Sequence, residues 1–239
     1  MMDTGTLLTL SAIIVAAAFI QGSVGVGFAL IVAPVFSLIK PELVPVALLV
    51  IMLPLNFYVA ARERGALDKP GLGWITIGRT LGTFVGAAIL LVISARALNI
   101  FVGLSTVLAA VLSLAAPSFK PGRNTLGAAG LVTGITETAT GIGGPPLALV
   151  YQHHPGPVLR STIAACFLIG EIISLIILAL GGRVTGALLV DSLLLIPAVL
   201  VGAGLSRLVH RRVGGRGLRA GVMIFAIAAG LFLLVRELI

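Results

Sequence analysis

Apolar runs of roughly 17 to 25 residues recur along the whole chain, and their length restricts the fold more than any other feature. At 1.5 Å per helical residue, a run of about 20 residues crosses the hydrocarbon core of a bilayer, which is about 30 Å thick. Hydrophobic residues make up 59% of the chain and charged residues only 10%, too few polar groups to cover a soluble fold. We therefore predict an all-α, polytopic integral membrane protein.

Six of these runs are uninterrupted and are expected to be complete transmembrane helices. They cover residues 43–61, 72–94, 97–115, 160–180, 186–205 and 218–235. Two further stretches, 5–39 and 125–153, are too long for one straight crossing, and glycines break both of them. The N-terminal apolar stretch lacks the basic segment of a secretory signal peptide, so we expect it to stay in the protein.

The two broken stretches resemble each other and indicate a duplicated unit. Gly25-Val26-Gly27-Phe28 aligns with Gly141-Ile142-Gly143-Gly144 at an offset of 116 residues. The same offset places Pro41 on Pro157, Gly86 on Gly202, and Arg96 on Arg212. We therefore divide the chain into a first membrane repeat, 1–120, and a second, 121–239, which form one integral membrane unit.

The basic residues of the loops indicate how the broken stretches lie in the membrane. If both stretches cross the bilayer, these residues divide almost evenly, eight on one side and seven on the other. If both fold back, eleven lie on one side, and only Lys40, Arg96, Arg183 and Arg236 lie on the other, the asymmetry expected of cytoplasmic loops. We therefore predict two inverted repeats, each with a glycine-broken re-entrant hairpin plus three transmembrane helices. A mixed arrangement, with one stretch crossing and one folding back, stays open.

The glycine breaks point to a binding site. Helix restarts near Phe28 and Pro145 would present N–H groups and positive dipole ends, which attract anions. Close helix packing is the alternative explanation for such glycines, but two breaks at corresponding repeat positions favour a transport site. Hydroxyl groups on the breaks could donate to an anion or bond local carbonyls. The candidate substrate-binding residues on the breaks are Gln21, Gly22, Ser23, Gly25, Gly27, Thr138, Thr140, Gly141, Gly143, Gly144 and Pro145.

Polar side chains inside the spans complete the candidate site, because buried ionisable groups are costly in a membrane. Arg79 could pair with an anionic substrate, or it could be a structural or snorkelling arginine. Glu171 could exchange a proton for coupling, pair with Arg79, or hydrogen-bond between helices. Glu137 could bind a coupling cation or gate the hairpin, although a structural bond to freed backbone is slightly favoured. Asn56 needs a partner inside the bundle and is a further substrate-binding candidate.

Several other functions are excluded by the same residues. The basic residues sit in short connections without an aromatic-lined basic face, so no nucleic acid is expected as a partner. His153 and His154 diverge, and no nearby cysteine or carboxylate completes a ligand set, so we predict no metal. The chain has no phosphate-binding loop for ATP. We predict no cofactor.

The paired glycine motifs, above all Gly141-Ile142-Gly143-Gly144-Pro145-Pro146, resemble the sulfite exporter TauE/SafE family of membrane permeases. The resemblance covers nearly the whole chain in length, spacing and repeated halves. It implies a permease for sulfite, sulfoacetate and related small organic anions, in the inner (plasma) membrane with several crossings. The partners expected are a small anion, the lipid bilayer and, as an open option, a second copy in a homodimer.

Two alternative functions stay open beside an anion permease. One is a cation-coupled or cation transporter that uses Glu137 and Glu171. The other, less favoured, is an intramembrane enzyme, which would need a nucleophile and base at membrane depth that the sequence does not clearly supply. We expect the protein not to be an enzyme.

Overall fold

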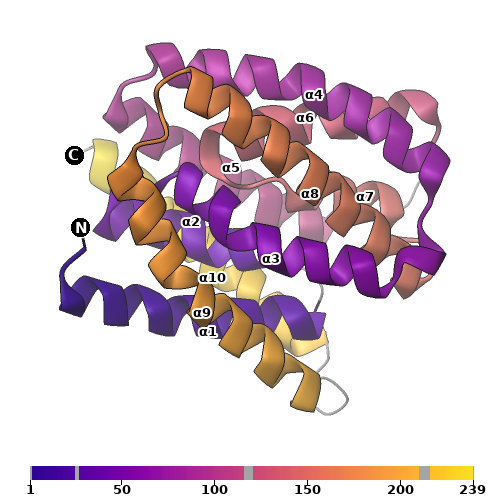
Figure 1. Cartoon of the computed structure of the whole chain (residues 1–239), viewed down its shortest axis with the longest axis horizontal. Helices are drawn as coiled ribbons and strands as arrows, with labels where there is room; N and C mark the ends of the chain where they lie inside the picture. Colours follow the sequence, from indigo (N-terminus) through magenta and orange to yellow (C-terminus); the bar gives the residue numbers. More distant parts are fainter. Residues whose placement is uncertain (1, 25–26, 116–120, 210–215, 239) are drawn as a thin grey trace.

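A computed structural model describes residues 2–24, 27–115, 121–209 and 216–238 (Figure 1). The regular elements of these residues are all helices. The long and broken helices are α1 (Thr4–Val24), α2 (Phe28–Ile39), α3 (Val46–Arg62), α4 (Lys69–Val92), α5 (Ala95–Ala115), α6 (Arg123–Thr140), α7 (Gly144–Tyr151), α8 (Gly156–Leu180), α9 (Gly186–Val209) and α10 (Arg216–Leu238). Two 3-10 turns, Pro41–Leu43 and Arg64–Ala66, precede α3 and α4.

The prediction of an all-helical membrane protein is confirmed. In the described residues, six helices are long and apolar enough to cross a membrane, and five of them, α4, α5, α8, α9 and α10, coincide with predicted spans. The predicted span 43–61 begins as a helix only at Val46, because Pro41 and Pro45 precede it, and α3 is 17 residues long. Instead α1, with 21 residues, is long enough by itself, although we predicted it only as part of a broken stretch.

Two glycines with positive φ lie at the breaks. Gly141 ends α6 in the left-handed region, with φ of 78°, and its N–H donates to the Glu137 carbonyl at 2.7 Å. Gly27 precedes α2 with φ of 122°, and a Cβ there would also press on Val222. A side chain at either position would strain the backbone, so these glycines set where the helices stop and restart.

α1, the first helix of the first broken stretch, runs parallel to α9. α1 packs against α9: the Met2 N–H donates to Asp191 near the start of α9, and Gly22 near the end of α1 lies against Ser206. α6 packs against α4 in the corresponding way, because Gly78 lies against Gly127, and Gly86 further along lies against Ile135.

Two other pairs of helices are antiparallel. In the pair α3 and α8, Arg160 near the start of α8 bonds Glu63, which follows the end of α3. Partial burial raises the pKa of the Glu63 carboxyl, but hydrogen bonds from Arg160 and Arg62 outweigh this and hold the pKa below its ordinary value. In the pair α5 and α10, Asn99 near the start of α5 donates to Glu237 near the end of α10.

Polar contacts define two ends of the bundle. At one, which we call the N-terminal end, Asp191 accepts from both the Met2 N–H and the Lys40 ammonium, so α2 finishes where α1 begins. We call the other end the opposite end; there the Tyr151 hydroxyl donates to Asp68, and the Arg123 guanidinium lies over the Trp74 ring. The start of α6 and the end of α7 therefore meet there. The start of α1 and the end of α10 lie toward the same side of the bundle in Figure 1.

The bundle surface is apolar, as expected where lipid is the solvent. Leu81 and Phe84 on α4, Leu193 on α9 and Phe232 on α10 are each more than half exposed. A water-soluble monomer rarely exposes large contiguous apolar patches, whereas lipid chains solvate such side chains well.

Glycines let α4 and α6 approach backbone to backbone. A Cβ at Gly78, Gly82 or Gly86 of α4 would collide with backbone atoms of α6, and a Cβ at Gly130 or Gly134 of α6 would collide with α4. For these five residues, close packing is a sufficient explanation.

Replacing Gly82 by alanine should destabilise the protein, because the new Cβ would meet the Leu131 carbonyl oxygen. Overpacking of this kind costs roughly 1–3 kcal/mol. The matched control is Gly73→Ala on the same helix, where a Cβ meets nothing within 4 Å. Thermal unfolding of both variants in detergent measures the difference, and equal melting temperatures would contradict tight α4–α6 packing.

Candidate functional site

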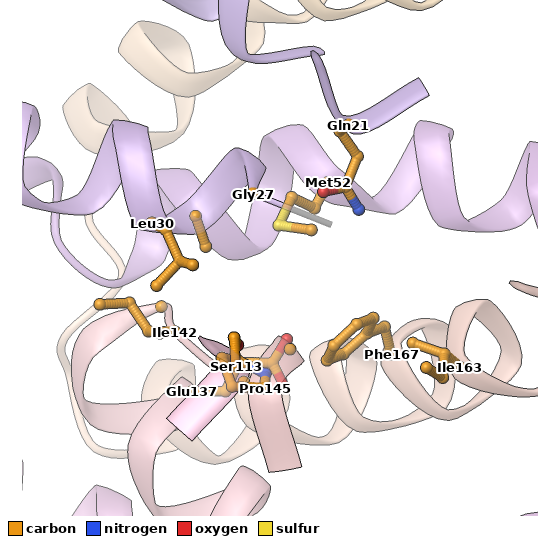
Figure 2. A pocket seen from close by; sticks show the side chains of 14 residues that line it. Gln21, Gly27, Leu30, Met52, Ser113, Glu137, Ile142, Pro145, Ile163 and Phe167 are labelled. Carbon is orange, nitrogen blue, oxygen red and sulfur yellow. The ribbon is translucent and has the colours of Figure 1, made fainter. Parts of the chain in front are cut away.

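The two glycine breaks, 116 residues apart in sequence, line one pocket (Figure 2). Gly27, Ala29 and Leu30 come from the restart at α2, and Gly141 to Pro145 from the restart at α7. The remaining lining residues are Gln21, Met52, Ser113, Glu137, Ile163 and Phe167. The space between these residues is about 540 Å³ when open solvent at the mouth is included, and about 40 Å³ of it can hold the centre of a water-sized molecule. Of the predicted substrate-binding residues, Gln21, Gly27, Gly141, Gly143, Gly144 and Pro145 therefore lie together.

The backbone amides at the pocket differ from the expectation. The Phe28 N–H, predicted to be available, donates to the Gln21 side-chain oxygen at 3.0 Å. At α7, Pro145 and Pro146 carry no N–H, so the amides available at this helix start are those of Gly143 and Gly144. At α2, helix geometry leaves the N–H groups of Ala29 and Leu30 without an intrahelical acceptor. The positive helix ends remain, with fewer donors than the sequence suggested.

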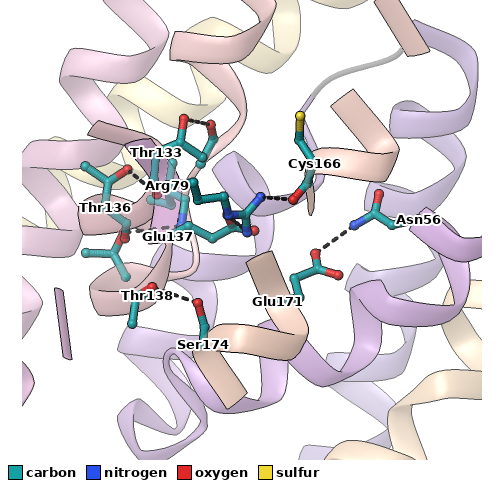
Figure 3. Close-up of polar contacts among 12 residues, drawn as sticks. Asn56, Arg79, Thr133, Thr136, Glu137, Thr138, Cys166, Glu171 and Ser174 are labelled. Carbon is teal, nitrogen blue, oxygen red and sulfur yellow. Dashed lines mark hydrogen bonds and ion pairs between the residues drawn. The ribbon is translucent and has the colours of Figure 1, made fainter. Parts of the chain in front are cut away.

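Arg79 is buried in the bundle and pairs with Glu137 (Figure 3). Its guanidinium also donates to the Cys166 carbonyl at 2.7 Å and lies 5.2 Å from the centre of the Phe167 ring. Gly170 of α8 leaves space for it, since a Cβ there would overlap the guanidinium. Charge pairing and a cation–π contact together replace the water that the guanidinium loses.

Arg79 does not itself line the pocket. Glu137 and Phe167, which both contact it, form the pocket wall in front of it. Sequence analysis considered a pair between Arg79 and Glu171, but the structure pairs Arg79 with Glu137 instead. We had slightly favoured a hydrogen bond between Glu137 and the backbone groups that the helix break leaves unpaired, whereas the structure shows the ion pair with Arg79.

Glu137 also lies directly against the start of α7. A Cβ on Gly143 would be 2.8 Å from the Glu137 carboxylate oxygen. At the offset of 116 residues, Glu137 corresponds to Gln21, and Gly144 corresponds to Phe28, whose N–H Gln21 accepts. The two halves thus place an acidic and an amide side chain at equivalent helix restarts. The offset in the sequence could have revealed this correspondence, which our sequence analysis missed.

Glu171 and Asn56 form a second buried polar pair. The Asn56 amide donates to a Glu171 carboxylate oxygen at 2.7 Å, between α3 and α8 (Figure 3). The other Glu171 oxygen has no hydrogen-bond partner among the described residues. Neither side chain lines the pocket. Asn56, predicted as a substrate ligand, therefore bonds Glu171 in this conformation.

The hydroxyl groups on the second break serve the protein rather than the pocket. Thr138 shares a hydrogen bond with Ser174 at 2.8 Å, and Thr140 donates to the Thr136 carbonyl while it accepts from the Ile142 N–H. On the first break, Gly22 lies against Ser206. Gly25 and the side chain of Ser23 lie outside the part of the chain that the structure describes.

An apolar cluster of buried side chains lies nearer the N-terminal end than the pocket does along α3 and α8. It contains Val46, Leu49, Val50, Ala87, Leu90, Ala139 and Leu178. Along α8 the pocket residues Ile163 and Phe167 come first, then Glu171, and Leu178 of the cluster last. A hollow lies beyond it at the N-terminal end, lined in part by Val46 and Leu90 and by Lys40 and Arg183.

Residues 10–233 match the family model for the sulfite exporter TauE/SafE. The chain belongs to the sulfite exporter TauE/SafE family. This confirms the resemblance found in the glycine motifs and makes the protein a multi-pass membrane permease of a family of sulfite-type anion transporters. No curated protein and no solved structure matches the chain.

Removing one partner of the Arg79–Glu137 pair should destabilise this TauE/SafE protein more than removing both. Arg79→Met leaves a buried carboxylate without its cation, which costs roughly 3–5 kcal/mol. The double variant Arg79→Met/Glu137→Gln should recover much of that loss. Thermal unfolding in detergent checks the cycle, with Thr83→Val on the same helix as a control. Additive losses in the double variant would show that the two groups do not interact.

Proposed function

We propose that this protein is a secondary permease that carries a small anion, such as sulfite, sulfoacetate, another organosulfonate or a short carboxylate, by alternating access around its two broken helices. The observation that carries the proposal is the pocket formed jointly by both helix restarts, with a buried guanidinium behind its wall. Helix N-termini and an arginine favour anions by the same electrostatics.

The proposed inverted repeats are supported by which helices pack together. With α1–α5 matched to α6–α10, the contact of α1 with α9 corresponds to that of α6 with α4. The contact of α3 with α9 likewise corresponds to that of α8 with α4. α3 packs against its own counterpart α8, and α5 against α10, both antiparallel. Two counterparts that are antiparallel neighbours are expected around a two-fold axis in the membrane plane.

In each broken stretch the first helix, α1 with 21 residues or α6 with 18, is about as long as a full crossing, so the support for the proposed re-entrant hairpins comes from the short second helices. The 12 residues of α2 span about 18 Å from the N-terminal end, and the 8 residues of α7 span about 12 Å from the opposite end. Together these lengths equal the roughly 30 Å of a hydrocarbon core, and the two restarts line the same pocket. We infer that the tips meet near the membrane interior from opposite faces.

The charges support an orientation. Among the described side chains, Arg62, Arg64, Arg123 and Arg160 belong to the opposite end, together with Lys69. The basic residues at the N-terminal end are Lys40, Arg96, Arg183 and Arg236. These two described sets are nearly equal in number, so the orientation rests on the count over the whole sequence, eleven basic residues against four. With the positive-inside rule, we infer from that count that the opposite end faces the cytoplasm. We infer that the apolar cluster, which lies nearer the outer face than the pocket residues do along α8, closes the pocket toward the outside and is the gate that opens in the alternate state.

A cation transporter is the second candidate, and it rests on Glu171, a buried carboxyl that forms no ion pair within the described part of the chain. The hydrogen bond that Glu171 accepts comes from a neutral amide, that of Asn56, and Glu137 forms an ion pair with Arg79. Within the described residues, no group of three or more histidine, cysteine or acidic side chains is placed to hold a metal ion. The anion permease therefore has the stronger support.

Purified protein in liposomes should take up labelled sulfite or sulfoacetate down a concentration gradient. Arg79→Met should reduce the rate by at least about tenfold, since an arginine–anion contact is worth roughly 1.5–3 kcal/mol. Arg64→Met, an exposed loop residue, is the matched control and should transport normally. Absence of flux for both anions, with cation-dependent flux of another solute, would favour the cation transporter.

The inverted arrangement predicts that the two connections after the broken helices face opposite sides of the membrane. In a Cys166→Ala background, cysteines replace Glu42, which follows α2, and His153, which follows α7; both are exposed. A membrane-impermeant thiol reagent should label them from opposite faces. Labelling from the same face would indicate parallel repeats.

The same experiment checks the gate. Ile163 lines the pocket on the side of the opposite end. A cysteine at this position should react from the face that labels residue 153 and stay protected from the face that labels residue 42. The reverse pattern would contradict a closed gate at the apolar cluster.

A further inference from the structure

We propose that Glu137 is a built-in competitor of the transported anion for Arg79, and that the anion displaces the Glu137 carboxylate while this carboxyl takes up one proton. The inference rests on the proposed anion transport and adds its coupling ion. The structure places Glu137 where such an exchange requires it: the side chain lines the pocket and pairs with Arg79, which itself lies behind the pocket wall.

An anion in the pocket therefore meets a negative charge before it meets Arg79. Phe167 forms the other part of the wall in front of the guanidinium. To form its own contact with Arg79, the anion must move the Glu137 carboxylate aside. The Glu137 carboxylate occupies the place proposed for a substrate oxyanion, because it pairs with the Arg79 guanidinium beside the start of α7.

The other half of the molecule indicates that a charge is not needed for the structural part of this role. Gln21, the counterpart of Glu137, caps the start of α2 with a neutral amide oxygen. A neutral side chain can thus hold a helix restart in this fold. The acid at residue 137 supplies something that a glutamine would not, namely a negative charge that can be neutralised.

The charged and titratable groups around Glu137 limit what happens when it leaves Arg79. α4 contributes Arg79, and α8 contributes Glu171 and Cys166; the described residues of α2 and α5 near the pocket contribute none, and Tyr151 of α7 bonds Asp68 at its far end. No second cation faces Glu137 from these helices. A displaced, ionised carboxylate would stay buried without compensation, whereas a protonated one is neutral.

The exchange balances in charge and atoms. Before it, Arg79 is paired with the Glu137 carboxylate; after it, Arg79 is paired with the anion, and an O–H bond has formed on a Glu137 oxygen with a proton from water. No covalent bond breaks in the protein. With one proton taken up, a monovalent anion leaves the net charge of the site unchanged, whereas sulfoacetate, with its sulfonate and its carboxylate, makes the site more negative by one charge.

Binding of sulfoacetate to the detergent-purified protein tests the proposal, because the charge of this probe is constant between about pH 6 and pH 9. In the unsubstituted protein, affinity should fall up to about tenfold per pH unit on the alkaline side of the Glu137 titration. Binding should also withdraw about one proton per site from a weakly buffered solution. In Glu137→Gln, affinity should be independent of pH and, at alkaline pH, tighter than in the unsubstituted protein.

Glu171→Gln is the matched control, because it removes another buried carboxyl, one that does not form an ion pair with Arg79. This variant should keep the pH dependence. Sulfoacetate binding without proton uptake would overturn the proposal and leave anion transport intact. Loss of the pH dependence in Glu171→Gln but not in Glu137→Gln would overturn the assignment to Glu137. Absence of binding at every pH would overturn the proposed function for organosulfonates and this inference with it.

Discussion

The buried guanidinium of Arg79 is the group on which the arrangement of the second half depends. A charged side chain in hydrocarbon persists only with a partner, and here the partner comes from a different helix, 58 residues further along the chain. That pairing requires α4 and α6 to lie close, which their glycines permit, and it requires space on α8, which Gly170 provides. Packing, polarity and the pocket wall are therefore consequences of one electrostatic requirement.

Glycine has two separate physical roles in this protein. Along α4 and α6 its missing Cβ lets two backbones touch. At Gly27 and Gly141 its freedom at positive φ ends one helix and begins another. Only the second role creates helix ends inside the bundle, and only those ends line the pocket. A count of glycines alone would not separate the two roles, whereas their position relative to the ends of apolar runs does.

The sequence was sufficient for those features that depend on length and local chemistry. Apolar run lengths predicted five of the six span-length helices, glycines predicted both breaks, and Pro145 and Pro146 indicated the second helix restart. Contacts between helices that are distant in the sequence could not be predicted from it, because they depend on how each helix is rotated about its axis. The partner of Arg79 and the pairing of Asn56 with Glu171 belong to this kind. The prediction that the Phe28 N–H is available was wrong because this N–H donates to the side-chain oxygen of Gln21, which lies one helix turn before the break.

The unequal lengths of the two short helices have an electrical consequence. With the hairpins placed as proposed, an anion at the junction of α2 and α7 lies about 12 Å from one face of the hydrocarbon core and about 18 Å from the other. A membrane potential acts on it in proportion to those depths. At 100 mV the full crossing of one charge is worth about 2.3 kcal/mol, so the two stages of the passage would carry roughly 0.9 and 1.4 kcal/mol. Voltage would thus weight entry and exit differently for an uncompensated anion.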